Sequence, residues 1–157
     1  KFSLYEDLTV SENIRLYAGI YGLGRRYILR REEQLLEQLG LRHVRNQLIR
    51  EIPLGWKQKL AFSVAVFHRP DLVFLDEPTG GVDPITRRQF WEMIHKTARE
   101  GITVFVTTHY MDEAEYCDRV CIMTEGRIAA LDHPASLKER YHSQNMNEVF
   151  IKLARKQ

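Results

Sequence analysis

The stretch LVFLDEP, residues 72–78, decides the fold, because four apolar residues in a row are followed at once by two acids and a proline. An apolar run this short is typical of a strand that is buried on both faces. Two carboxylates at the end of such a strand are costly unless a positive partner lies near them. The stretch therefore predicts a buried strand over 72–76 and, directly after it, a site in which Asp76 and Glu77 meet a positive partner.

A second apolar run, residues 102–106, closes on Thr107-Thr108-His109. Between the two runs, Asp83 before Pro84 predicts the start of a helix, because the carboxylate caps and proline suits the first turn. Strand, helix and strand in this order indicate an α/β protein with parallel strands flanked by helices. Ligands of open α/β sheets bind beyond the carboxyl ends of the strands, so His109 is expected to converge with the two acids.

The first 52 residues show helical periodicity and no strand signal. Thr9 and Glu12 fit a capping box, and the helices that follow are expected to stop at Gly22 and Gly40. A third helix is predicted to begin at the break of residues 53–56. Residues 25–50 carry seven arginines against three glutamates, which favours a solvated helical face and leaves a partner or a phospholipid surface as the alternative.

The last third of the chain predicts smaller elements. They are a short polar helix (111–117), a hairpin of strands 120–124 and 127–131, a capping box at Ser136–Glu139, and a last amphipathic helix around 146–153. Cys117 and Cys121 lack the further ligands of a zinc site. We expect both cysteines to be small buried residues of a reducing compartment.

The composition is that of an ordinary globular protein, with 44% hydrophobic and 28% charged residues in 157. A net charge of +2 gives no electrostatic case for nucleic acid as a partner. The chain has no apolar run near the ~20 residues that cross a bilayer. It has no signal-peptide core and no initiator Met. We therefore expect a cytoplasmic chain that is cut from a longer protein.

Two acids and a histidine at the edge of a sheet suit Mg²⁺-assisted phosphoryl chemistry. One carboxylate can anchor the metal, the other can orient water, and the histidine can touch a phosphate oxygen. The simpler alternatives are that Asp76-Glu77-Pro78 begins a turn and that His109 is a satisfied polar residue. The combination of the three groups favours the chemistry.

Three segments together closely resemble the ATP-binding cassette (ABC) ATPase family: LVFLDEPT at 72–79, GGVDP at 80–84 and VFVTTH at 104–109. The resemblance holds in order and spacing and extends over almost the whole chain. It implies a P-loop NTPase-like partial core with ATP and Mg²⁺ as cofactors.

The resemblance also implies residue roles. Asp76 would close the Walker B strand and bind Mg²⁺, usually through water, and Glu77 would be the catalytic carboxylate that polarises the attacking water. His109 matches the switch histidine that contacts the γ-phosphate. Asp83 matches the D-loop aspartate, which lies at the interface with a second cassette.

The family's domain plan divides the chain in three. Residues 1–68 would be the helical subdomain, which includes the signature loop and engages a membrane-spanning partner. Residues 69–132 would be part of the RecA-like core, and residues 133–157 a helical tail.

The family signature, commonly Leu-Ser-Gly-Gly-Gln, aligns with residues 52–56, where proline and leucine replace the serine and the first glycine and only Gly55 is kept. Through the resemblance we assign Gly55, Trp56 and Lys57 to the ATP of the opposite cassette, with helix N-terminal amides from Trp56 onward facing the phosphate. Proline lacks both N–H and hydroxyl, so at least one donor is lost. Such degenerate signatures resemble paired cassettes of ABC-2 type exporters.

The chain contains no phosphate loop of the form Gly-x-x-x-x-Gly-Lys-Ser/Thr; the stretch GIYGLGRR at 19–26 follows a helical pattern and lacks the Lys-Ser/Thr. The resemblance therefore implies the later portion of an ABC transporter ATP-binding subunit, inactive on its own. Its partners would be a permease, which holds it at the inner face of the membrane, and a second cassette, as a homodimer or fused in tandem. The alternatives are an ABC-type ATPase that transports nothing and a non-catalytic interaction module.

Overall fold

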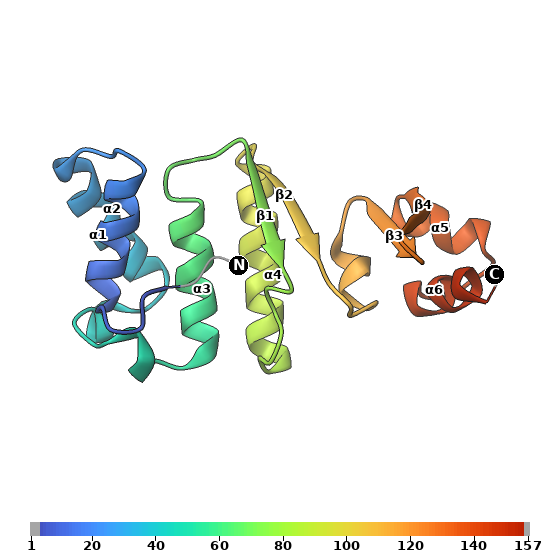
Figure 1. Ribbon diagram of the computed structural model, residues 1–157, viewed down its shortest axis with the longest axis horizontal. Coiled ribbons are helices and arrows are strands. Elements are labelled where there is room, and N and C mark those ends of the chain that lie inside the picture. Colours follow the sequence, from blue (N-terminus) through green and yellow to red (C-terminus); the bar gives the residue numbers. More distant parts are fainter. Residues whose placement is uncertain (1–3, 156–157) are drawn as a thin grey trace. The chain divides into compact units, whose positions relative to one another are not determined.

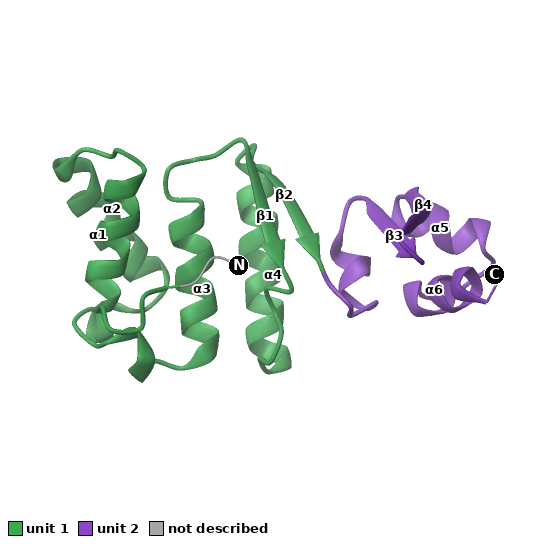
Figure 2. Cartoon of the chain, in the orientation of Figure 1, with its two compact units in different colours: residues 1–107 green, residues 108–157 purple. Residues whose placement is uncertain are grey.

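The computed structural model describes residues 4–155 of the chain. The chain divides into two compact units, residues 1–107 and residues 108–157, which Figure 2 shows in green and purple. This division does not coincide with the expected boundaries after residues 68 and 132. The three-part division that the family resemblance implies therefore stays a prediction.

Unit 1 combines helices with a two-stranded sheet (Figure 1). Its regular elements in chain order are α1 (Val10–Ile20), α2 (Arg25–Gln38), 3-10 turns at Arg42–Val44 and Ile49–Glu51, α3 (Leu54–Ala65), β1 (Leu72–Asp76), α4 (Pro84–Arg99) and β2 (Thr103–Thr107). The predicted strand at 72–76 is confirmed, and the second strand lies one residue later than expected.

Local chemistry sets the ends of these helices, as the sequence predicts. Thr9 Oγ1 accepts a 3.1 Å hydrogen bond from the Glu12 amide, while Glu12 Oε2 accepts a 2.8 Å bond from the Thr9 amide, which completes the capping box of α1. These bonds to Thr9 lower the pKa of Glu12. Gly40 and Gly101, just beyond α2 and α4, adopt left-handed φ angles of 68° and 93°, which end a helix at little cost for glycine.

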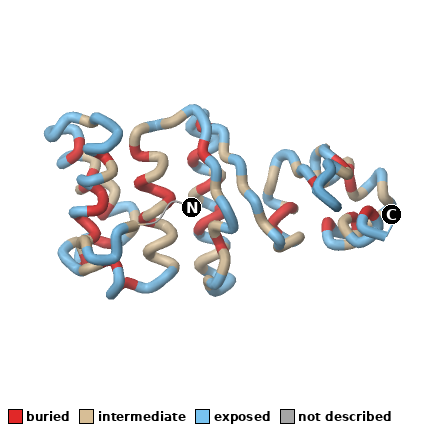
Figure 3. The backbone as a smooth tube through the Cα atoms, in the orientation of Figure 1, coloured by how far each residue is buried: buried red, intermediate tan, exposed pale blue. Residues whose placement is uncertain are grey.

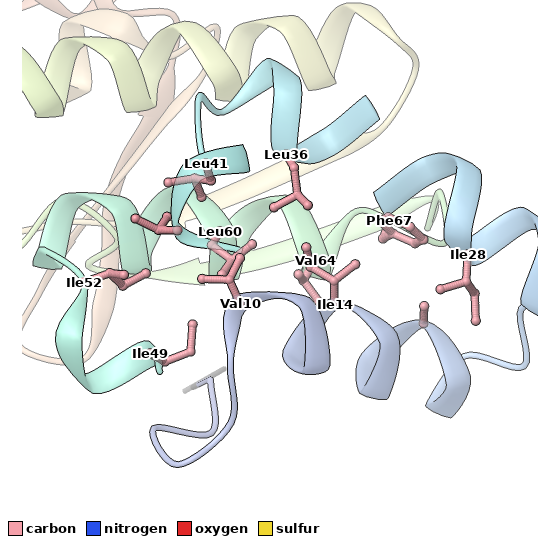
Figure 4. Close-up of a cluster of buried hydrophobic side chains, with 12 residues drawn as sticks. Val10, Ile14, Ile28, Leu36, Leu41, Ile49, Ile52, Leu60, Val64 and Phe67 are labelled. Carbon is pink, nitrogen blue, oxygen red and sulfur yellow. The ribbon is translucent and has the colours of Figure 1, made fainter. Parts of the chain in front are cut away.

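The helices α1, α2 and α3 enclose one cluster of buried apolar side chains (Figure 4). Val10 and Ile14, one turn apart on α1, face Leu60 and Val64 on α3. Burying an aliphatic side chain of this size contributes about 1.5–3 kcal/mol. The cluster therefore holds α3, and with it the segment 52–56 from which α3 begins.

The sheet of unit 1 is parallel, with β1 and β2 paired from Leu72↔Thr103 to Asp76↔Thr107. The expectation that β1 is buried on both faces is wrong: Val73 is buried, but Phe74 is 72% exposed and its ring tilts against Phe105 at 5.6 Å. Figure 3 shows the two strands mostly exposed. Phe105, on the neighbouring strand, is 50% exposed.

Unit 2 is built from a hairpin and helices. Its elements are a 3-10 turn (Glu113–Tyr116), β3 (Val120–Thr124), β4 (Arg127–Asp132), α5 (Pro134–Arg140) and α6 (Met146–Ala154). The strands β3 and β4 are antiparallel, so the predicted hairpin is confirmed. Ile122 and Ala130 from the hairpin pack with Leu137, Met146 and Val149 from the two helices.

Three expectations for unit 2 need correction. The helix α5 begins at Pro134 after the extended residue His133, so Ser136 lies inside the helix and no capping box forms there. The polar helix is shorter than predicted and is a 3-10 turn. Cys121 is exposed, because it lies on the hairpin face opposite the buried Ile122, and Cys117 is half-buried, with its pKa raised to about 11 mainly by burial.

The arginine-rich stretch proves to be partly structural. Glu32, 1% exposed on α2, accepts hydrogen bonds from Ser11 and Arg15 on α1 and from Arg45 beyond α2. The arginines at 25, 26 and 30 are exposed, in keeping with a solvated face. Glu32 therefore links three segments of unit 1 around one buried carboxylate.

Candidate functional site

The two predicted acids lie at the carboxyl end of β1, beside the end of β2. Asp76 pairs in register with Thr107, and Asp76 Oδ1 accepts a 2.8 Å hydrogen bond from Thr107 Oγ1. This hydroxyl orients the carboxylate of Asp76, which is exposed. Asp76 thus lies at the carboxyl end of the strands, where ligands of open α/β sheets bind.

Glu77 has a left-handed backbone, with φ 44°, which is uncommon for a residue that carries a Cβ. Its amide donates a 3.0 Å hydrogen bond to the carbonyl of Thr107, which continues the pairing of the two strands by one residue after β1 ends. Its own carbonyl accepts a 3.2 Å bond from the Gly80 amide. Backbone outliers of this kind cost about 1–3 kcal/mol and cluster at functional sites. Three other non-glycine residues of the described chain share this conformation, and Glu77 is the one of them that lies at the carboxyl end of β1.

A pocket of about 420 Å³ opens beside the two acids. Its lining is mostly apolar and comes from α3, β1, β2 and α4; the polar side chains in it are Gln58, Asp76, Glu77 and Thr107. A concave apolar surface with a few placed polar groups is the usual form of a ligand site. A second groove, of about 690 Å³ between α2, α3 and α4, contains none of the predicted site residues.

The N-terminus of α3 follows Pro53, which provides no side-chain cap. The amides of Trp56 and Lys57 donate to the Pro53 carbonyl at 3.0 and 3.1 Å. The Trp56 amide, expected to face a phosphate, is therefore already used within the helix. Among the described residues, the amides of Leu54 and Gly55 have no partner, and these are the donors that this helix N-terminus presents.

The side chains of Trp56 and Lys57 make structural contacts. The Trp56 ring packs against the core cluster of unit 1 and meets the His43 ring edge-on, with centroids 5.4 Å apart. Lys57 Nζ lies 3.4 Å from Glu6 Oε1. Their assignment to nucleotide binding stays a prediction.

Asp83 caps α4, as the sequence predicts. Asp83 Oδ1 accepts from the amides of Ile85 and Thr86 at 3.0 and 2.9 Å, and Oδ2 accepts from Thr86 Oγ1 at 2.6 Å. The hydrogen bonds from Thr86 lower the pKa of Asp83. The carboxylate of Asp83 is thus oriented by its own helix.

Gly55 lies against the first turn of α4. A Cβ placed on Gly55 would come 2.6 Å from Thr86 Cγ2, closer than carbon atoms approach without strain. The Thr86 side chain cannot rotate its methyl away without breaking the hydrogen bond from its hydroxyl to Asp83. The one glycine kept from the family signature is therefore required by packing inside this chain.

We predict that Gly55→Ala destabilises the protein by about 1 kcal/mol. Overpacking costs about 1–3 kcal/mol, and the higher helix propensity of alanine offsets about 1 kcal/mol of that cost. Thr86→Ser removes the opposing methyl and keeps the hydroxyl. In that background the same alanine substitution should become neutral or stabilising. Urea denaturation of the four proteins checks this, and an equal loss in both backgrounds would contradict the contact.

His109 belongs to unit 2, so the expected convergence of all three groups stays a prediction. It is exposed, two residues beyond β2, with its ring 4.1 Å from that of Tyr110. The preceding Thr108 donates a 2.7 Å hydrogen bond to Glu113 Oε2, and Glu113 is fully buried. Glu113, which no motif of the sequence indicates, therefore fixes the segment that carries His109.

Among residues 4–155, no group of three or more His, Cys, Asp or Glu side chains is arranged to hold a metal ion. Mg²⁺ is usually bound by one or two carboxylates together with substrate phosphates and water. The exposed carboxylate of Asp76 fits that mode of binding. Within the same residues, no helix has the length and apolar character needed to span a membrane.

The fold and the motif residues define a member of the ABC transporter family, and a profile of that family, described as ABC transporter, matches residues 1–80. The α/β fold agrees with this assignment. A solved structure described as the ATP binding subunit of an ABC transporter matches with a TM-score of 0.81 at 29% identity, covering 96% of this chain and 64% of that one. The chain belongs to the ABC transporter family.

Particular relatives carry related names. The chain is 44% identical over 158 aligned residues to "Probable multidrug ABC transporter ATP-binding protein YbhF" of Escherichia coli (strain K12), covering 98% of this chain and 27% of that protein. It is 34% identical to "ABC transporter ATP-binding protein NatA" of Bacillus subtilis (strain 168), covering 94% of this chain and 61% of that protein. The chain thus spans about a quarter to three fifths of these two relatives.

Proposed function

We propose that this chain is the later portion of the ATP-binding subunit of an ABC exporter, in which ATP binding and hydrolysis drive transport across a membrane. The pair of acids at the end of β1 carries the proposal. Thr107 orients Asp76, and Glu77 sits on a strained backbone beside the same pocket. The names of the relatives YbhF and NatA, both ATP-binding proteins of ABC transporters, support the class of function.

In this proposal the carboxylate of Asp76, which accepts a hydrogen bond from Thr107, would hold Mg²⁺. When bound, the ion neutralises charge on the phosphates of ATP. Glu77 orients the attacking water and accepts its proton, since a carboxylate within reach of water is a suitable general base. His109 would, as the family resemblance implies, donate a hydrogen bond to an oxygen of the γ-phosphate.

The N-terminus of α3 would face the ATP of a second cassette. Pro53 offers neither an N–H nor a hydroxyl, so the donors left are the amides of Leu54 and Gly55. A hydrogen bond to a charged group contributes about 1.5–3 kcal/mol. We therefore propose a composite site that works with fewer donors than the common signature, as in a dimer or a fused pair of cassettes.

The remaining elements of the proposal concern partners. The helical part of unit 1, up to residue 68, would engage a membrane-spanning permease and so hold the subunit at the inner face of the membrane. Asp83, held in the first turn of α4, would lie at the interface with the second cassette.

The test is ATP turnover by the complete subunit, the longer protein proposed to carry this chain. We expect hydrolysis that requires Mg²⁺ and that is lost when Glu77 is replaced. Turnover without Mg²⁺, or turnover that is indifferent to Glu77, would contradict the proposed function.

A further inference from the structure

The N-terminal turns of α3 and α4 touch at several points along one seam. Gln58 Nε2 donates a 3.0 Å hydrogen bond to the carbonyl of Gly80, in the loop that leads from β1 to α4. The next residue, Lys59, donates to Gln89, and one turn beyond Gln58 the ring of Phe62 lies 5.4 Å from that of Phe90. The hydrogen bond from Gln58 ties α3 to the loop 79–83.

A second, steric contact joins the same two segments. Gly55 approaches the Thr86 methyl so closely that no Cβ fits between them, and Asp83 holds the Thr86 hydroxyl. Leu54 Cδ2 lies 3.5 Å from where a Cβ on Gly81 would be. The helix N-terminus at 53–55 and the loop 79–83 therefore fit together at short range.

The Gln58 amide is bound at one end only. Its Oε1 is buried and has no hydrogen-bond partner among residues 4–155. Burying an unpaired amide oxygen is costly, so a side chain that served packing alone would be better replaced by an apolar one. The donated bond to Gly80 is the feature that a glutamine provides here and a methionine would not.

We infer that Gln58 is a positioning residue that locks the N-terminus of α3 and the loop 79–83 into one piece. The inference rests on the proposed function, which assigns both segments to the contact with a second cassette. If they move as one piece, the Leu54 and Gly55 amides and Asp83 reach the opposite cassette in a fixed relation. Gln58 also lines the pocket beside the two acids, but in this inference it acts through its bond to Gly80.

The size of the effect follows from the fraction of molecules in which the two segments are aligned. An apparent binding constant falls in proportion to the competent fraction. Suppose that the Gln58 bond raises the aligned fraction of each copy about threefold. Its loss then lowers the population of pairs in which both copies are aligned about tenfold, because a pair of cassettes contains two copies. The loss should appear in the assembled, hydrolysing state and not in the initial capture of ATP.

The experiment measures kcat and KM for ATP hydrolysis by the complete subunit with its partners. Gln58→Met keeps the shape and removes the donor, whereas Gln58→Lys keeps a donor. The matched control is Gln89→Met, which removes a side-chain bond between the same two helices away from the loop. Thermal midpoints are recorded alongside and should stay within about 4 °C of the parent, the shift that about 1 kcal/mol produces in a domain of this size.

We expect Gln58→Met to lower kcat about tenfold with KM within about twofold, and we expect Gln58→Lys and Gln89→Met to stay close to the parent. Equal losses in Gln58→Met and Gln58→Lys would overturn the inference, because packing and not the donated bond would then be responsible. An unchanged kcat in Gln58→Met would also overturn it. If the parent shows no Mg²⁺-dependent hydrolysis that Glu77→Gln abolishes, the proposed function fails, and this inference fails with it.

Discussion

Replacing Glu77 with glutamine in the complete subunit will lower the turnover number for ATP by roughly 10²–10⁴-fold, the contribution expected of a positioned acid–base group. Glutamine keeps the size of the side chain and its ability to accept a hydrogen bond from water. It cannot accept the proton that the water loses. The measurement is steady-state phosphate release in the presence of Mg²⁺.

The chain offers a matched control for the unusual backbone at this position. Glu125, in the hairpin turn of unit 2, also has a left-handed φ, of 47°. Glu125→Gln makes the same chemical change on the same kind of backbone and should leave turnover unaltered. The 157-residue chain alone, which has no phosphate loop, should show negligible hydrolysis in the same assay. A Glu77→Gln protein with near-parental turnover would remove Glu77 from the catalytic role.

Replacing Glu32 with alanine will lower the free energy of unfolding by about 2–3 kcal/mol, the largest effect on stability that we expect from replacing one buried polar residue. The substitution removes the acceptor of the Ser11 hydroxyl, which is 5% exposed, and the shared partner of Arg15 and Arg45. The two guanidinium groups are 47% and 38% exposed and can turn toward water, so the loss stays below that of a fully buried pair.

Glu33→Ala is the matched control for Glu32. Glu33 is the next residue of α2, is 45% exposed and pairs with Arg42 and Arg45 at the surface. Exposed pairs contribute about 0.2–1 kcal/mol. Urea denaturation, together with hydrogen exchange of the α1 and α2 amides, measures both proteins. Similar losses for the two substitutions would show that the buried carboxylate is not what links the three segments.

Elements with strong local chemistry could be predicted from the sequence. The apolar run of β1 and the Asp83-Pro84 start of α4 each depend on a few adjacent residues, and the structure has both where the sequence predicts them. The capping box of α1 is confirmed for the same reason. The apparent box at Ser136 was wrong because Pro134, two residues earlier, already begins the helix.

Features that depend on distant residues could not be predicted in this way. The Glu32 network joins residues that are 13 to 21 positions apart in the chain. Gln58 and Gly80 are 22 positions apart, and neither residue type predicts the hydrogen bond between them. Of the candidate site, the sequence predicted the acids but missed Thr107, whose role depends on the register of a parallel pair.

The most direct measurement of the central claim is the structure of the complete subunit, carrying Glu77→Gln, with ATP and Mg²⁺ bound. We expect the metal beside the carboxylate of Asp76, the γ-phosphate within hydrogen-bond distance of His109, and the amides of Leu54 and Gly55 from a second cassette facing that phosphate. ATP bound away from the end of β1, for example in the groove of about 690 Å³ between α2, α3 and α4, would contradict the account.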